Sequence, residues 1–243
     1  MKLVQPLFYK LTCNNMQNNI LRQLYVFVRR KYRVLFKNNF SKRDIELLKD
    51  KNFVIVCDNC WAGSVYQWLE RPYNSPFISI GFYGDCYIKL LSNFEYYMGL
   101  PLNFIKESKY NYREITYPLA KLGDIELHFT HYKTEKEAGT KWTRRTARML
   151  EETNRDNYIF MMSDAWYASE KNFEDFNKLP FKNKISFSIN EYKHLNLNNH
   201  YPILEKDKKD KNRVPNGVKL FKIMFIYVNL YKWIKLKLDN SLT

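Results

Sequence analysis

Glycine and proline are scarce in this sequence, with only seven glycines and eight prolines among 243 residues. All-β folds with many tight turns and low-complexity chains are richer in both residues. Long apolar runs are missing too, since no stretch reaches the roughly 18 residues that a membrane-spanning helix requires. The composition therefore favours a globular α/β protein that is soluble or bound to the surface of a membrane.

Cysteine is also sparse, and the four cysteines show no repeated metal-binding spacing. Cys57 and Cys60 form one C-x-x-C pair, a pattern found in zinc sites and in thiol redox couples. A zinc site needs two further ligands, and no second such pair or H-x-x-x-H follows. We therefore expect no metal and no resident cofactor. Because no signal peptide is recognisable and the cysteines are expected to be reduced, we predict a cytoplasmic protein.

Positive charge and aromatic residues are what the sequence has in excess. Forty Lys and Arg against 25 Asp and Glu leave a formal charge of +15, and aromatics make up 17% of the chain. The charge indicates an anionic partner: nucleic acid, a phosphorylated small molecule or an acidic membrane. The basic residues gather toward the chain ends, and no RNP-like, helix-turn-helix or finger motif is present. We therefore expect no nucleic-acid partner.

Three regions follow one another along the chain. We interpret residues 1–49 as a basic extension with an amphipathic helix, 50–205 as an α/β catalytic domain, and 206–243 as a charged linker with a basic amphipathic helix over 218–238. In the central region, strands are predicted at 53–57, 78–82, 115–119, 125–132, 158–162 and 185–189, and the main helices at 85–98, 135–152 and 170–179. This alternation predicts a three-layer α/β/α fold with a mainly parallel, Rossmann-like sheet.

The two terminal helices combine lysine or arginine with apolar and aromatic residues. This composition is typical of helices that lie in the interface of a membrane. We therefore predict that the protein is peripheral at the inner face of the cytoplasmic membrane, bound through its terminal helices to anionic lipid. The alternative is that the C-terminal helix simply closes the core of the α/β domain.

The turn after the first predicted strand is the first candidate site. It carries Asp58, Asn59, Cys60, Trp61 and Gly63 between a strand and a helix. Open α/β sheets bind ligands at this end of their strands, where a helix N-terminus offers amide donors to an anion. Cys60 is a candidate nucleophile and its four neighbours are candidate substrate-binding residues. The alternative is a packed turn with a buried cysteine.

A second candidate site follows the predicted strand over 125–132. Asp124, Glu126, His128 and Thr130 alternate along the chain, so on a strand they would share one face. Polar side chains on an interior face cost free energy unless they line a site. Asp124, Glu126 and His128 are therefore candidate catalytic acids and bases, and His131, on the opposite face or in the turn that follows, is a candidate substrate-binding residue. The alternative is an edge strand with one wet face.

The third candidate site is the helix predicted over 135–152. Lys141, Arg145 and Arg148 are spaced i, i+4 and i+7, so they form one cationic stripe that suits a diphosphate. A solvated helix face is the alternative. With the end of the strand at 158–162 included, the candidate substrate-binding residues here are Lys141, Trp142, Arg144, Arg145, Arg148 and Asp164.

Five ordered segments carry a resemblance to a known family. They are the turn Asp58–Gly63, the run from Tyr73 to Phe77, the strand region Asp124–Tyr132, the helix start Glu135–Arg145 and the loop Leu179–Lys184. Over roughly residues 50–205 the chain resembles the bacterial exopolysaccharide-biosynthesis family catalogued as domain of unknown function 1919. The resemblance implies a role in the assembly of capsule, exopolysaccharide or lipopolysaccharide.

Three functions remain open for the chain. We expect first a metal-independent glycosyltransferase that uses a nucleotide sugar and a lipid-linked or glycan acceptor, with a base at Asp124, Glu126 or His128. The alternative is a polysaccharide O-acyltransferase that uses acyl-CoA, with Cys60 as nucleophile or His128 as base. The third is a non-catalytic component of a membrane synthase complex.

Overall fold

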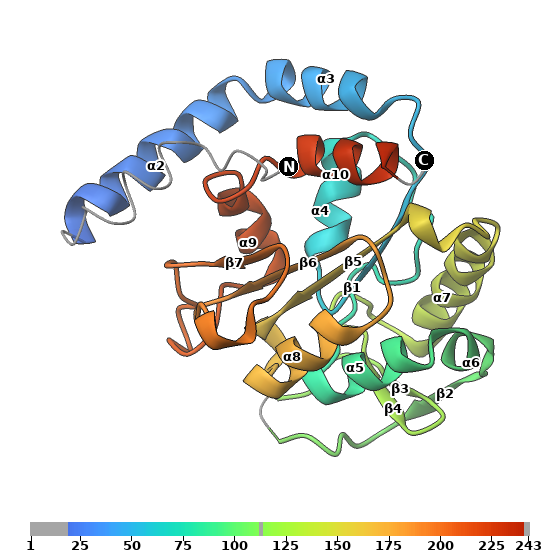
Figure 1. Ribbon diagram of the computed structural model, residues 1–243. Coiled ribbons are helices and arrows are strands. Elements are labelled where there is room, and N and C mark those ends of the chain that lie inside the picture. The colour runs from blue at the N-terminus through green and yellow to red at the C-terminus, as the bar shows by residue number, and fades with distance from the viewer. Residues whose placement is uncertain (1–18, 112–113, 241–243) are drawn as a thin grey trace.

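The computed structural model describes residues 19–111 and 114–240, so the first 18 residues of the N-terminal extension lie outside the described residues. Four parallel strands form the main sheet in the order β1-β5-β6-β7 (Figure 1). They are β1 (Val54–Cys57), β5 (Tyr158–Ser163), β6 (Lys184–Ser188) and β7 (His200–Pro202). The predicted α/β fold with a parallel sheet is confirmed, although β7 was not predicted.

Helices cover both faces of this sheet (Figure 1). One face carries α4 (Trp61–Trp68), α9 (Gly217–Met224) and α10 (Leu230–Asp239), and the other carries α5 (Gly84–Ser92), α6 (Phe94–Gly99) and α8 (Glu170–Lys178). Strands buried from both sides need apolar residues at every position. β1, with the sequence Val-Ile-Val-Cys, is accordingly buried throughout.

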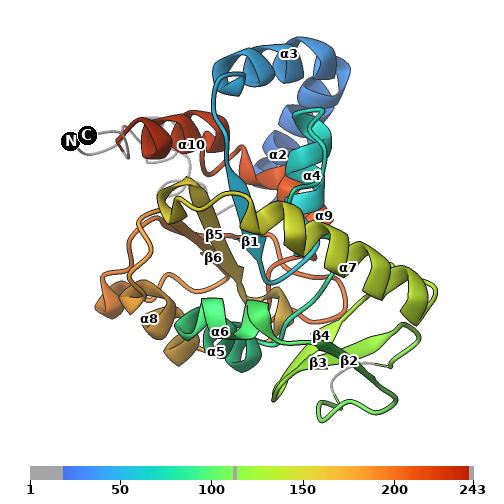
Figure 2. The same ribbon diagram turned by 90° about the vertical axis from the view of Figure 1, so that its right-hand side faces the viewer.

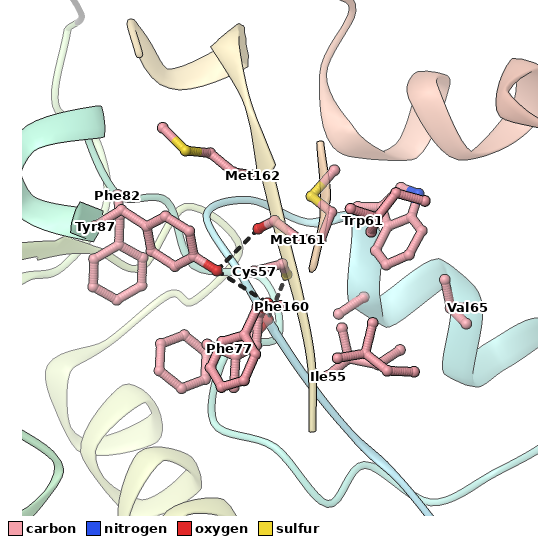
Figure 3. Close-up of a cluster of buried hydrophobic side chains, with 14 of the residues drawn as sticks. Ile55, Cys57, Trp61, Val65, Phe77, Phe82, Tyr87, Phe160, Met161 and Met162 are labelled. Carbon is pink, nitrogen blue, oxygen red and sulfur yellow. Dashed lines mark hydrogen bonds between the residues drawn. The ribbon is translucent and has the colours of Figure 1, made fainter. Parts of the chain in front are cut away.

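The core joins β1 to its neighbours on both sides (Figure 3). Trp61 and Val65 of α4 lie on one side of the sheet, and Tyr87 of α5 reaches in from the other. The Tyr87 phenol is 3.0 Å from the carbonyl oxygen of Val56 and 2.9 Å from that of Met161. This contact ties β1 to β5 at the level where the candidate turn begins.

A second, antiparallel sheet of order β2-β3-β4 packs beside the first (Figure 2). It consists of β2 (Leu102–Ile105), β3 (Leu119–Leu122) and β4 (Ile125–His128), and α7 (Glu135–Leu150) leads away from it. β2 was not predicted. The predicted strand over 78–82 is wrong, because only Gly81 of that segment pairs, in a single bridge to His128. The strand predicted over 125–132 ends at His128, where the chain turns.

A local break explains one further difference from the predicted helices. The helix expected over 85–98 is interrupted at Asn93, whose backbone leaves the helical region (φ −139°, ψ 55°), and is divided into α5 and α6. The start of α7 was predicted correctly: the Thr134 side chain accepts a hydrogen bond from the Glu137 amide. A side-chain oxygen at the N-cap satisfies an amide that has no partner within the helix.

The terminal segments pack onto the central α/β unit. The structure corrects the prediction of one helix over 218–238, because residues 225–229 separate α9 from α10. α9 packs on α4, and α10 packs on α3 (Lys37–Leu48), which follows α2 (Asn19–Leu35). The buried side chains of the two C-terminal helices include Leu220, Met224, Tyr231, Trp233 and Ile234. In the part of the chain that the structure describes, no helix has the length and apolarity to cross a membrane.

Candidate functional site

The turn after β1 lies at the carboxyl end of the parallel sheet, as the sequence predicted, and the structure places it beside the end of β5. Asp58 accepts hydrogen bonds from the amide and hydroxyl of Ser163, at 3.0 and 3.2 Å. Asn59 donates to the Ser163 hydroxyl at 2.8 Å and accepts from the Trp61 amide at 2.8 Å. Burial raises the pKa of Asp58 well above its usual value. Asp58, Asn59 and Trp61 are buried, and their contacts hold the turn in its conformation.

Asp164 is also a structural residue. Its two carboxylate oxygens accept the backbone amides of Val214 and Ile189, each at 2.8 Å. Burial raises the pKa of Asp164 to about 6. The side chain thereby joins the ends of β5 and β6 to the segment that precedes α9, so the predicted substrate-binding role of Asp164 has no support in its contacts.

Cys60 is the member of the turn that reaches the surface. It occupies the N-cap of α4 and is partly exposed. Its Sγ lies 3.1 Å from Nε2 of His131 and 3.8 Å from the hydroxyl oxygen of Thr130. Cys57, the other cysteine of the C-x-x-C pair, is fully buried, and burial raises the pKa of its thiol. The two cysteines thus occupy different environments, and only Cys60 is accessible.

The chain reversal after β4 places His131 beside Cys60. The amide of Thr130 donates to the carbonyl of His128 at 3.0 Å, and the amide of Tyr132 to that of Phe129 at 3.0 Å. The Thr130 hydroxyl then donates to the carbonyl of Ser79 at 3.3 Å. Together these bonds present the exposed imidazole of His131 to the first turn of α4.

Ser79 adds backbone strain to the same place. Its φ of 63° lies in the left-handed region, which a residue with a Cβ seldom adopts. Strained residues persist where the surroundings over-determine them, and they cluster at functional sites. Ser79 was not singled out from the sequence, because a single strained residue leaves no pattern of residue types.

The three residues of the cationic stripe of α7 all contact other parts of the protein. Arg145 is buried; its guanidinium donates to the Tyr132 hydroxyl at 2.7 Å and lies 4.9 Å from the centre of the Tyr73 ring. Arg148 donates to the Tyr73 carbonyl at 3.3 Å, and Lys141 pairs with Glu137 at 2.6 Å. Arg145 therefore supports the chain reversal that carries His131.

The remaining residues of α7 point in two directions. Trp142 is buried against the rings of Phe77 and Phe129, so it belongs to the core. Arg144 is exposed and lines an open hollow of about 370 Å³. The residues around this hollow are Thr134, Lys136, Glu137, Thr140, Lys141 and Arg144.

Gly63, which was predicted to bind substrate, is buried within α4.

The predicted shared face of Asp124, Glu126 and His128 is corrected by the structure. Asp124 lies in the turn before β4 and is exposed, paired with Lys89. Glu126 and His128 do share a face, with 2.9 Å between Glu126 Oε1 and His128 Nε2, but both side chains are fully buried. The hydroxyl of Tyr117 lies 3.2 Å from His128 Nδ1. The pair is thus enclosed, because β4 is an interior part of the fold at these residues.

The site that the structure assembles is therefore the pair formed by Cys60 and His131. Both residues had been named from the sequence, but as parts of separate candidate sites. An imidazole beside a thiol can accept its proton and leave a thiolate, the nucleophilic form of cysteine. Among the described residues, no group of three or more His, Cys, Asp or Glu side chains could hold a metal ion.

Comparison with known proteins confirms the domain that the five sequence segments resemble, and the description of that domain names no role. The family model described as "Domain of unknown function (DUF1919)" matches residues 31–233, a range that contains Cys60 and His131. An uncharacterized protein of Haemophilus influenzae is 35% identical over 145 residues, which are 60% of this chain and 66% of that protein. The chain thus spans slightly less than two thirds of the length of this relative.

Proposed function

The chain belongs to the family described as domain of unknown function 1919, and from this premise we propose that it is an acyltransferase acting through a covalent intermediate on Cys60. The observation that carries the proposal is the 3.1 Å contact between Cys60 Sγ and His131 Nε2 at the carboxyl edge of the sheet. Of the two transferases considered from the sequence, acyl transfer is the one that needs such a pair. The base is His131 and not the enclosed His128.

The chemistry follows from the positions of the two groups. His131 Nε2 takes the proton of the Cys60 thiol, and the thiolate attacks the thioester carbonyl of an acyl-CoA. A new carbon–sulfur bond forms on Cys60, and the CoA thiolate leaves with the proton from His131. In the second half, His131 removes the proton of an acceptor hydroxyl, which attacks the acyl-enzyme. Cys60 leaves as a thiolate and is protonated again by His131.

The acceptor is proposed from the resemblance of the five sequence segments. The resemblance implies that the acceptor is a hydroxyl group of a bacterial capsule, exopolysaccharide or lipopolysaccharide, or of a lipid-linked precursor. The accessibility of the pair supports an acceptor of this size, because His131 is exposed and Cys60 is partly exposed. A large glycan can therefore approach the pair from solvent.

A direct test is the mass of the protein after incubation with acetyl-CoA. We expect an acetyl adduct on Cys60 that Cys60→Ala abolishes. His131→Ala should slow adduct formation by roughly 10²–10⁴, the usual contribution of a positioned base. His194→Ala is the matched control, since His194 is also exposed but pairs with Glu170 away from Cys60. An adduct that persists in Cys60→Ala, or that forms equally fast without His131, would contradict the proposal.

Glycosyl transfer is the second candidate, supported by the hollow on α7. Lys136, Lys141 and Arg144 bring three cations to its rim, which suits the diphosphate of a nucleotide sugar. Stabilisation against heat by a nucleotide sugar, lost in Arg144→Glu, would favour this candidate, because a ligand of the native state raises its stability. Stabilisation by CoA alone would favour acyl transfer. If neither ligand binds, the non-catalytic component of a membrane synthase complex becomes the better proposal.

A further inference from the structure

Helix α2 exposes its apolar face and turns arginines toward the protein. Large apolar side chains along its outer side are strongly exposed: Ile20 80%, Leu21 52%, Leu24 56%, Phe27 56%, Val28 53% and Leu35 77%. With 3.6 residues per turn, these six positions fall within an arc of about 120°. In Figure 1, α2 forms an outer edge of the molecule, away from both sheets.

The inward side of α2 is held by cationic groups. Arg22 donates to the Tyr227 hydroxyl at 2.6 Å and pairs with Glu205 at 3.1 Å. The Arg33 guanidinium lies 4.2 Å from the Trp68 ring and 4.9 Å from the Phe225 ring. These contacts set the rotation of α2 about its axis. An ordinary surface helix buries its apolar stripe. α2 instead turns this stripe to solvent and places arginines against the protein.

This orientation leaves a large apolar area in water. Burial of apolar side chains stabilises a folded protein, and these six side chains do not gain that stabilisation because they stay exposed. Contiguous apolar patches of this kind mark surfaces that dock onto another partner. The question is which partner fits.

Charge identifies the partner as an anionic surface. The first acidic residue of the entire chain is Asp44, and the exposed cations Arg30, Lys31, Lys37 and Lys42 lie on α2 and the adjoining helix α3. Lys31 lies within the apolar arc with its ammonium 5.5 Å from the Phe27 ring. A long side chain there can leave its stem among apolar groups while its charge reaches the headgroups.

We propose that the exposed face of α2 docks onto a bilayer that contains anionic phospholipid. The helix lies flat at the headgroup boundary, with its apolar arc in the acyl region and the flanking lysines and arginines near the phosphates. The segment that joins α9 to α10 supports α2 on its inward side, because Tyr227 contacts Arg22 and Phe225 contacts Arg33. The inference does not depend on the chemistry at Cys60.

The test is co-sedimentation of the whole protein with vesicles of phosphatidylglycerol mixed with phosphatidylcholine. We expect binding that the double variant Leu24→Gln, Phe27→Gln weakens at least about tenfold, because two exposed anchors are lost. The double variant Leu150→Gln, Leu204→Gln changes two apolar residues that are exposed by 39% at the end of α7 and by 50% in the segment after β7, and it should bind like the natural protein. Both variants should unfold at the same temperature as the natural protein.

Two comparisons separate the bilayer from other occupants of the face. Binding should weaken in pure phosphatidylcholine and in salt, because the attraction is screened beyond about 10 Å at 0.1 M. Light scattering without lipid should show a monomer. The proposal is overturned if the natural protein ignores the anionic vesicles, if both double variants bind them equally, or if the face instead joins two copies into a dimer that Leu24→Gln, Phe27→Gln dissociates.

Discussion

The buried carboxyl group of Asp164 makes the free energy of unfolding depend on pH. Its pKa of about 6 in the folded chain exceeds the usual value of 3.8, so between these values the folded state binds more protons than the unfolded state. The free energy of unfolding contributed by Asp164 is therefore fully present below about pH 4 and is lost as the pH rises through 6. A difference of two pKa units corresponds to about 3 kcal/mol.

The variant Asp164→Asn isolates this contribution because asparagine does not titrate in the same range. We expect the variant to be less stable than the natural protein, and the difference between them to be about 3 kcal/mol larger at pH 4 than at pH 7. Urea unfolding at several pH values measures both quantities. The buried Asp58, whose pKa is also raised, is present in both proteins, so its effect largely cancels. A difference that stays constant with pH would show that Asp164 titrates normally.

At the scale of elements, α9 lies close against the turn that carries Cys60. α9 begins at Gly217, and a Cβ there would lie 2.2 Å from Asn59 Oδ1 and 2.5 Å from the Trp61 amide. Neither atom can move away easily, because the Trp61 amide donates a hydrogen bond to Asn59 Oδ1 at 2.8 Å. The absence of a side chain at Gly217 thus lets α9 close over the turn.

Gly217→Ala should therefore displace α9 and lower the free energy of unfolding by about 2 kcal/mol, as overpacking of a filled site does. Adduct formation on Cys60 should slow as well, because the turn that holds Cys60 moves. Gly99→Ala is the matched control: no atom lies within 4 Å of a Cβ there, and alanine is favoured over glycine in a helix. Equal stability of the two variants, measured by urea unfolding, would contradict the role given to Gly217.

For the whole molecule, we expect the α/β unit to need the C-terminal helices in order to fold. A chain that ends at Lys211 lacks the buried side chains of α9 and α10, among them Leu220, Tyr231, Trp233 and Ile234. At about 1.5–3 kcal/mol for each buried side chain, their loss is comparable with the 5–15 kcal/mol that stabilises a typical domain.

We expect this shortened chain to be insoluble or unfolded, as judged by its soluble yield and its circular dichroism. If the C-terminal helix served only as the membrane contact predicted from the sequence, the same truncation would leave a folded domain. A folded, monomeric chain of residues 1–211 would show that α9 and α10 are dispensable for the core. The vesicle experiment on α2 uses the complete chain for this reason.

The sequence by itself determined the class of fold and the limits of its most regular elements. The apolar run at 53–57 and the capped helix beginning after Thr134 are local patterns, and local patterns depend only on neighbouring residues. The position of Cys60 at a strand end could be predicted for the same reason. The family resemblance also rested on short segments, each of which can be recognised from its own residues.

Only the tertiary structure decided which histidine lies beside Cys60, since His131 is 71 positions away in the chain and His128 is three residues nearer. The two histidines differ because β4 ends at His128, so one imidazole stays in the interior and the other reaches the surface after the turn. The same holds for α2, whose apolar and basic faces are evident in the sequence. Which of them turns outward depended on Tyr227, Trp68 and Phe225, and contacts at such separations leave no trace in local periodicity.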